Sequence, residues 1–210
     1  MLDKYKTISR QSQIELIEKK SRFIGTVLEV STQEAADLAL QSIRKTYYNA
    51  AHNCFAYQIG ESNEIQRSSD DGEPSGTAGK PILDVLKGAD VRNTLIVVTR
   101  YFGGTLLGTG GLVRAYGKTA KEGLLAAGVV EKRRVQLFYL QMPYHLSGKV
   151  QYLLSDKGYT IRNTSYLETV TFETEVLLGE QEAFCKWLIE NTHAEVLIKE
   201  GEYTLITVPL

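Results

Sequence analysis

Cysteine is scarce in this 210-residue sequence, which contains only Cys54 and Cys185, one in each half. Two distant cysteines without a C-x-x-C pattern exclude a disulfide framework and a thiolate metal site. The sequence also lacks a long apolar run and a basic-then-apolar leader at its start, which excludes a membrane-spanning helix and a secretory signal. We therefore expect a cytoplasmic protein with no membrane contact.

Net charge is also small, because 24 Lys and Arg stand against 25 Asp and Glu. A formal charge of −1 excludes a protein that coats nucleic acid by bulk attraction, since that mode requires a basic domain. A slight excess of positive charge precedes Val130 and a slight excess of negative charge follows it. Any basic patch is therefore expected in the first part of the chain.

Hydrophobic periodicity predicts alternating strands and helices over residues 1–130. Ser31 and Glu34 have the spacing of a capping box for a helix over residues 32–45. Residues 94–99 are β-branched and apolar on both faces, which is typical of a central buried strand. Val113 and Tyr116 begin the predicted buried face of a helix over residues 112–127. The remaining predicted elements are strands over residues 14–17, 23–28, 51–59 and 64–67, and a short helix over residues 82–87.

The pattern restarts after Gly128. Strands are predicted over residues 135–141, 159–163, 170–178 and 203–208, with helices over residues 146–156 and 181–190. This βαββαβ order is typical of a ferredoxin-like unit. The sequence therefore predicts two domains, residues 1–130 and residues 135–210.

Two glycine-rich loops, residues 68–79 and 103–111, each lead into a predicted helix. Neither completes a nucleotide-binding signature, because Pro74 stands where a P-loop needs glycine and Val113 stands at the last glycine of the dinucleotide pattern. Closely spaced glycines still free backbone N–H groups for an anion, and helix N-termini favour negative charge. We therefore expect phosphate at both loops. The glycines concerned are Gly76, Gly79, Gly103, Gly104, Gly110 and Gly111.

Cationic side chains adjoin both loops. Lys80 lies beside a predicted helix start, where a cation is disfavoured by about 0.3–1 kcal/mol unless an anion is bound. An exposed loop lysine is the alternative interpretation. Arg114, Lys118 and Lys121 form a basic stripe along the later helix, although such stripes are commonly only solvated helix faces.

Arg100 ends the predicted buried strand and is followed by two aromatic residues, Tyr101 and Phe102. A guanidinium beside aromatic rings can hold phosphates and stack on bases. Next to two glycine loops, this combination favours RNA as the ligand of the surface.

A second set of polar residues, His52, Asp70, Asp71 and Glu73, permits a different hypothesis. His52 and Cys54 share one face of a predicted strand, and the carboxylates could approach them to form an acid–base site. This arrangement would suit a phosphate-ester or peptide hydrolase. Asp-Asp-Gly is also ordinary turn chemistry, and a single histidine near a strand start is more often structural.

Several segments resemble the YigZ/IMPACT family. They are residues 21–24, 51–57, 70–79, 100–104 and 110–116, which read SRFI, AHNCFAY, DDGEPSGTAG, RYFGG and GGLVRAY. The resemblance implies an α+β protein. Its first domain has the βαβ-type fold shared by a ribosomal-protein domain and domain IV of elongation factor G, and its second domain is ferredoxin-like. The resemblance also implies a translation-associated role, since eukaryotic relatives regulate translation through protein partners.

We therefore expect a non-catalytic, regulatory factor of translation that binds RNA or the ribosome through the glycine-rich basic surface. It is expected to need no cofactor and no metal, and a protein partner in translation control is a further expectation. The hydrolase and a pure protein adaptor remain alternatives. The sequence leaves open the RNA preference, the oligomeric state and the exposure of Tyr101 and Phe102.

Overall fold

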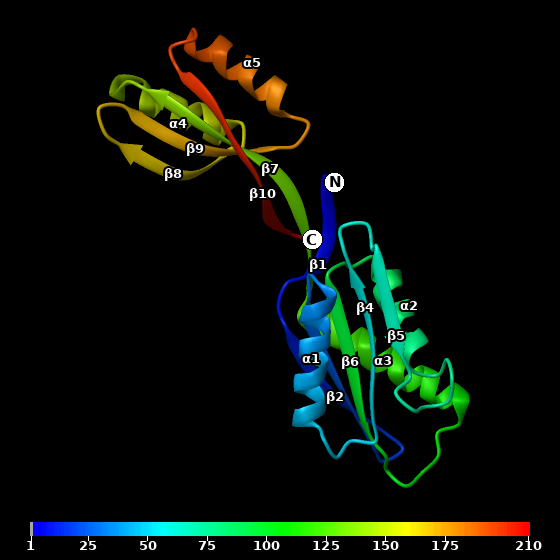
Figure 1. The fold of residues 1–210 in the computed structure, drawn as a ribbon. Coiled ribbons are helices and arrows are strands. Elements are labelled where there is room, and N and C mark those ends of the chain that lie inside the picture. Colours follow the sequence, from blue (N-terminus) through cyan, green and yellow to red (C-terminus); the bar gives the residue numbers. More distant parts are fainter. Residues whose placement is uncertain (1) are drawn as a thin grey trace. The chain divides into compact units, whose positions relative to one another are not determined.

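The computed structural model describes residues 2–210, which form mixed α and β structure (Figure 1). The chain divides into two compact units. Unit 1 runs to Glu131 and includes Val208–Leu210, and unit 2 comprises Lys132–Thr207. No helix among residues 2–210 is long and apolar enough to cross a bilayer.

Unit 1 is built on a five-stranded antiparallel sheet in the order β2-β3-β6-β4-β5. The strands are β2 (Ser12–Glu18), β3 (Ser21–Glu29), β4 (His52–Ile59), β5 (Ile65–Ser69) and β6 (Thr94–Tyr101). The central strand β6 is buried over all but its last residue, because helices cover both faces of the sheet. The prediction of a central buried strand is therefore confirmed. A short strand, β1 (Lys4–Ile8), was not predicted, since two of its five residues are lysines.

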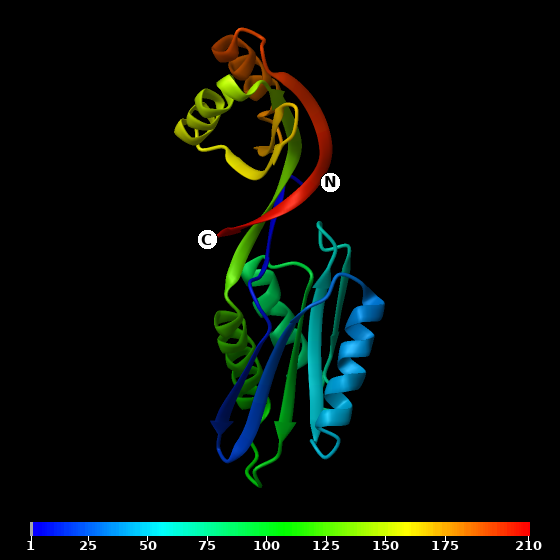
Figure 2. The same cartoon turned by 90° about the vertical axis from the view of Figure 1, so that its left-hand side faces the viewer.

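Helices cover both faces of the sheet of unit 1 (Figure 2). On one face, α1 (Gln33–Thr46) packs over Phe55, Tyr57, Leu95 and Val97. On the other, α2 (Gly79–Ala89) and α3 (Thr109–Ala127) pack over the alternate residues of the same strands. This division follows from the alternation of side chains along a strand.

Two details of these helices differ from the sequence predictions. The side chain of Thr32, not Ser31, caps α1 by accepting a hydrogen bond from the Ala35 N–H. Val113 is 40% exposed and does not belong to the buried face of α3. Leu112 takes the core position one turn before Tyr116, and helical spacing of 3 or 4 residues permits either choice.

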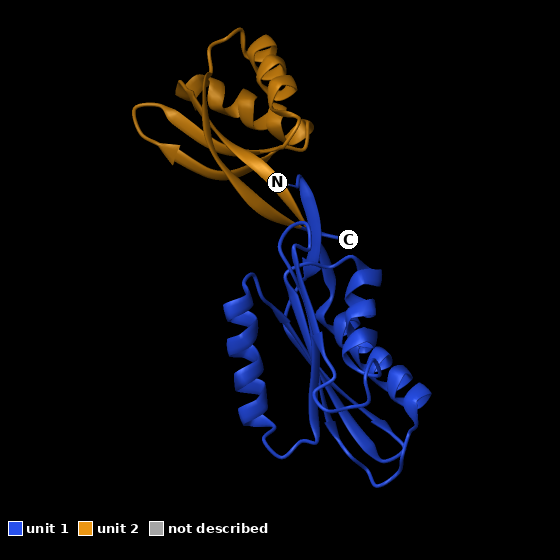
Figure 3. Cartoon of the chain, turned by 45° about the vertical axis from the view of Figure 1, so that its right-hand side comes forward, with its two compact units in different colours: residues 1–131, 208–210 blue, residues 132–207 orange. Residues whose placement is uncertain are grey.

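Unit 2 contains β7 (Val129–Met142), which begins in the last residues of unit 1, and five further elements (Figure 3). They are α4 (Tyr144–Asp156), β8 (Thr160–Tyr166), β9 (Val170–Leu177), α5 (Gln181–Thr192) and β10 (Leu197–Pro209). The strand order β10-β7-β9-β8 and the βαββαβ succession make this unit ferredoxin-like. Its core joins both helices to one face of the sheet, and Phe138, Phe172 and Phe184 are fully or almost fully buried there.

Candidate functional site

The residues singled out by the sequence gather at one end of the unit 1 sheet. The strand register pairs Arg100 of β6 with His52 of β4 on one side and with Phe23 of β3 on the other. The first glycine loop lies against His52, and the second follows β6 directly. The geometry of this end decides which groups can meet a ligand.

A buried ion pair joins the first loop to the sheet. The Arg100 Nη1 lies 2.6 Å from the Glu73 Oε1, and the two side chains are only 7% and 4% exposed. The Tyr116 hydroxyl donates to the same Glu73 oxygen at 2.7 Å, and the Arg100 Nη2 donates to the Ser21 Oγ at 3.4 Å. The guanidinium also lies 5.5 Å from the ring centres of Phe23 and Phe102. Arg100 is therefore an internal cation, neutralised by Glu73, and not an exposed phosphate contact.

Burial keeps two neighbouring groups protonated, the Tyr116 hydroxyl and the Cys54 thiol. Burial raises the pKa of the Tyr116 hydroxyl, and the nearby Cys54 and Glu73 raise it further. The phenol therefore stays protonated and donates to Glu73. Burial likewise raises the pKa of Cys54 to about 12, against the lowering effect of the Tyr116 hydrogen bond. The Cys54 thiol donates to the Asp70 carbonyl oxygen at 2.9 Å. A protonated, hydrogen-bonded thiol is not a nucleophile.

His52 has a defined tautomer. Its Nδ1 lies 2.8 Å from the Asp71 carbonyl oxygen. A carbonyl can only accept, so Nδ1 carries the hydrogen, and in the neutral ring Nε2 presents a lone pair. That Nε2 is 3.9 Å from the Glu73 Oε1, and no hydrogen-bond partner for it occurs among residues 2–210. In this neutral tautomer His52 therefore presents an acceptor at Nε2, next to the Glu73 carboxylate.

The first loop is closed by its own aspartates. The Asp70 Oδ1 accepts hydrogen bonds from the Ala78 and Gly79 N–H groups at 3.0 and 2.8 Å, and its Oδ2 accepts from the Gly76 N–H at 2.8 Å. Burial alone would raise the pKa of Asp70, but these three hydrogen bonds outweigh it and lower the pKa. The loop's amides thus already bind an anion, which is Asp70 itself. They are not free for an external phosphate.

Asp71 is engaged in the same way. Its Oδ2 accepts from the Asn53 N–H at 2.7 Å, and its Oδ1 accepts from Arg44 at 3.0 Å. No cluster of three or more metal-ligating side chains exists within the described part of the chain, residues 2–210. Of the four residues in the hydrolase hypothesis, His52 and Glu73 line one apolar cavity, and Asp70 and Asp71 are not part of that lining.

The second glycine loop is open. Gly104 and Gly108 have positive φ angles of 81° and 75°, and a Cβ on either would meet nothing within 4 Å. Gly108 caps α3 without a side-chain hydrogen bond, and the first turn of α3 contains no acidic residue. The N–H groups at the start of α3, where Gly110 and Gly111 lie, therefore have no side-chain cap.

Gly103 has a different task, because a Cβ there would lie 2.0 Å from the backbone of Lys20. Its N–H donates to the Ser21 Oγ at 3.1 Å. Only glycine permits this approach, which holds the β2–β3 turn against the second loop.

The β2–β3 turn brings Lys19 to the basic stripe of α3. Lys19, Arg114 and Lys118 line a groove of about 210 Å³ together with Glu18, Leu107, Gly111 and Ala115. We call this the basic groove. Lys20, adjacent to Lys19 in the turn, is also exposed. Lys19 was not among the predicted site residues, although two consecutive lysines in a hairpin turn were visible in the sequence.

An apolar cavity of about 460 Å³ lies beside the basic groove and shares Leu107 with it. Its lining residues are His52, Glu73, Pro74, Arg100, Phe102, Leu106, Leu107, Gly108, Thr109 and Leu112. Phe102 is 51% exposed and contacts the Arg100 guanidinium with its ring. Tyr101 is less exposed, and its hydroxyl donates to the Asn49 Oδ1 at 2.9 Å, so it does not line this cavity.

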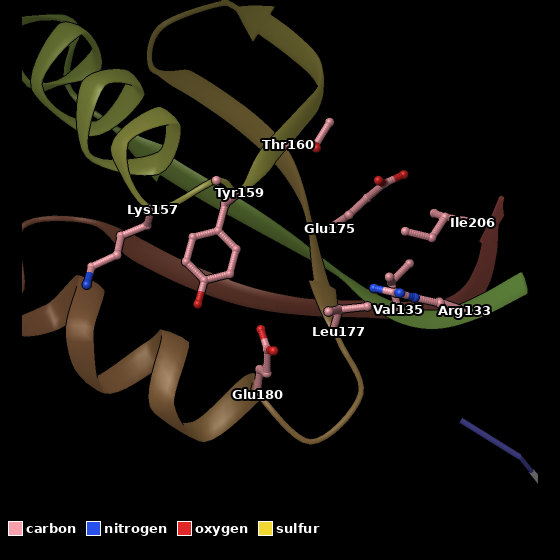
Figure 4. Close-up of a pocket in the computed structure, with 10 residues that line it drawn as sticks. Arg133, Val135, Lys157, Tyr159, Thr160, Glu175, Leu177, Glu180 and Ile206 are labelled. Atoms are coloured by element: carbon pink, nitrogen blue, oxygen red, sulfur yellow. The ribbon is translucent and has the colours of Figure 1, made fainter. Parts of the chain in front are cut away.

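Unit 2 has a cavity of about 290 Å³ of another kind (Figure 4). Figure 4 shows Lys157, Tyr159 and Glu180 around one end and Arg133 near the other. Burial and the nearby Glu180 raise the pKa of Tyr159. Because the lining holds two carboxylates, Glu175 and Glu180, beside its two cations, the cavity does not favour an anion.

Comparison with known proteins places these motifs in a family. The Impact N-terminal domain model matches residues 19–124, and the model of a domain of unknown function, DUF1949, matches residues 140–195. The chain is 45% identical to the IMPACT family member YvyE of Bacillus subtilis (strain 168) over 206 residues, 98% of this chain and 95% of YvyE. The chain belongs to the IMPACT family.

Two further similarities support this assignment. The IMPACT family member YigZ of Escherichia coli (strain K12) is 41% identical over 150 residues, 70% of this chain and 74% of YigZ. A crystal structure described as that of a hypothetical protein superimposes with a TM-score of 0.62 at 31% identity, covering 96% of this chain and 99% of the other. The predictions of the family and of the α+β fold class are confirmed.

The predicted site residues of this IMPACT-family chain differ in whether they face open cavities or make internal contacts. Arg114, Lys118, Gly111 and Phe102 line open cavities beside the second loop. The exposed Lys80 lies at the start of α2, next to amides that Asp70 already occupies. Gly76, Gly79, Gly103 and Arg100 are tied into internal contacts, as described above.

We expect Asp70→Asn to destabilise the protein by about 1–2 kcal/mol near neutral pH, because an amide nitrogen cannot accept the Gly76 N–H. Folding lowers the pKa of Asp70. The stabilisation that the Asp70 carboxylate gives the folded state is therefore complete above the unfolded-state pKa of about 3.9, and it is lost as the pH falls through the lower folded-state pKa. The difference between wild type and variant in urea unfolding should shrink below about pH 4. A difference that stays constant into stronger acid would contradict this role.

We expect Glu73→Gln to lower the free energy of unfolding by about 3–5 kcal/mol, because it leaves the Arg100 charge buried without its partner. Adding Arg100→Met should recover part of that loss, since it removes the unpaired charge. Glu34→Gln, at an exposed position in the first turn of α1, serves as the control and should change stability little. Urea unfolding followed by circular dichroism measures all three, and a Glu73→Gln loss no larger than the control's would contradict the assignment.

Proposed function

We propose that this chain is a translation-associated factor that binds RNA, on the ribosome, through the basic groove of unit 1. The observation that carries the proposal is the convergence of Lys19, Arg114 and Lys118 around one groove at the start of α3. These cations come from two separate segments, and the fold brings them together. The family resemblance supports translation as the process, and therefore the cytoplasm as the location.

Electrostatics favours an anionic backbone in this groove. Arg114 and Lys118 are both exposed and lie four residues apart on α3, where like charges repel by about 0.2–0.5 kcal/mol per pair. The start of α3 carries uncapped N–H groups and no acidic side chain. A bound phosphate relieves the repulsion and satisfies these donors. Glu18 is the one carboxylate in the groove's lining.

The small size of the basic groove is consistent with the low net charge of the whole chain. A formal charge of −1 gives no general attraction to nucleic acid, so binding rests on a few phosphate contacts at one place. Such binding is moderate and depends on salt in proportion to the number of contacts. This suits a factor that associates reversibly with a larger RNA-containing partner.

The hydrolase alternative finds no comparable support. Asp70 and Asp71 are engaged by backbone amides and Arg44, and Glu73 is neutralised by Arg100. The Cys54 thiol is protonated and buried. His52 therefore has no nucleophile beside it to activate among the residues that the structure describes, and a catalytic triad needs one.

The proposal predicts a salt-dependent affinity for a short single-stranded RNA. Arg114→Ala/Lys118→Ala should weaken binding and reduce the slope of log K against log salt by about 1.4, at roughly 0.7 per lost contact, between about 50 and 200 mM salt. Fluorescence anisotropy of labelled RNA measures both quantities.

The matched control is Lys149→Ala/Lys199→Ala, which removes the same charge from exposed positions of unit 2. It should leave the affinity and the slope near those of wild type. Equal affinities and slopes for wild type and the groove variant would overturn the proposal. Ribosome association that survives both the groove variant and nuclease treatment would indicate a protein partner instead.

A further inference from the structure

The apolar cavity beside the basic groove has no part in phosphate binding, and its chemistry points to a different group of the same ligand. The groove and the cavity share Leu107. Gly111 of α3 lines the groove, and the next residue, Leu112, lines the cavity. The two depressions therefore adjoin, so an RNA strand in the groove lies within reach of the cavity. The inference rests on the proposed function, since it concerns the same RNA.

The charge of the cavity selects a neutral occupant. Arg100 and Glu73, the two ionic groups in its lining, form a buried pair at 2.6 Å and cancel each other. An anion inside would lie against the Glu73 carboxylate, and a cation would lie against the guanidinium. At about 460 Å³ the cavity falls in the range of sites for small organic groups.

The polar groups of the cavity suit a ring that carries both donors and acceptors. In the neutral His52 ring Nε2 can accept a hydrogen bond; it makes none within residues 2–210 and lies 3.9 Å from the Glu73 Oε1. Thr109, at the first position of α3, lines the cavity and carries a hydroxyl that can donate or accept. These groups match the edge of an unpaired base, which presents N–H and carbonyl groups together.

The apolar walls suit the faces of the same ring. Phe102 is 51% exposed although its ring contacts Arg100, so a flat face remains open. Leu106 and Leu107 extend the apolar surface along the loop. Stacking of a base on an exposed aromatic residue contributes strongly and tolerates any base.

From these observations we infer that the cavity takes one unstacked base of a single-stranded RNA whose phosphates lie in the basic groove. Phe102 stacks on the base, and the His52 Nε2 accepts a hydrogen bond from its edge. Duplex RNA, whose bases are paired and stacked, cannot fill the cavity. The surface therefore distinguishes single strands from duplexes.

The test compares a short single-stranded RNA, the same strand with one internal abasic site at each position in turn, and the duplex. Wild type should bind the intact single strand most tightly, with at least one abasic strand and the duplex weaker by about tenfold. Phe102→Ala should weaken binding of the intact strand by a similar factor and leave the salt slope unchanged. Tyr152→Ala, an exposed aromatic residue of unit 2, is the control and should change nothing.

His52→Asn isolates the hydrogen bond, because the asparagine amide can still donate to the Asp71 carbonyl while the Nε2 acceptor is removed. It should weaken the intact strand about five- to tenfold. If RNA binds with the expected salt slope but Phe102→Ala and His52→Asn leave the affinity unchanged, the base cavity is overturned and the groove stands. If wild type binds no RNA at all, both proposals fall.

Discussion

The ion pair between Glu73 and Arg100 is the contact that organises the functional end of unit 1. It joins the first glycine loop to the central strand β6, while Tyr116 and Ser21 extend it to α3 and β3. A buried charge is tolerated only with a partner and further hydrogen bonds, and each group here has both. The pair therefore holds the loop, the sheet and the long helix in one arrangement.

This constraint gives the two glycine loops opposite characters. The first loop folds back so that Asp70 occupies its amides and Glu73 reaches Arg100. The second loop leaves β6 with Gly104 and Gly108 in open space and passes into α3 without a side-chain cap. An anion-binding arrangement exists in both, but one is filled by the protein's own carboxylate. The ligand surface that we propose is consequently confined to the second loop, α3 and the β2–β3 turn.

Periodicity and composition were sufficient for most of the fold. The run at residues 94–99 identified the buried strand because both of its faces are apolar, and the βαββαβ order identified the ferredoxin-like unit. Strand β1 and the cap at Thr32 escaped prediction, since short lysine-containing strands and adjacent hydroxyl residues carry weak local signals.

The site was less predictable, because it depends on contacts distant in sequence. Arg100 looks like an exposed cation until Glu73, 27 residues earlier, is placed against it. Asp70 looks like a turn residue until its carboxylate meets the amides of residues 76–79. Lys19 lies in the hairpin turn that Gly103 approaches, and it lines the groove with residues of α3 that come far later in the chain. Side-chain pairing across the fold, not residue type, separates internal from external charges here.

The central claim, that the first loop is closed and the second open, is tested most directly by amide chemical shifts of the ¹⁵N-labelled full chain during titration with a short single-stranded RNA. We expect the amides of Gly104, Gly108 and Gly110 to shift progressively and those of Gly76 and Gly79 to stay in place, held by Asp70. Shifts centred on Gly76 and Gly79, with the second loop unmoved, would contradict it.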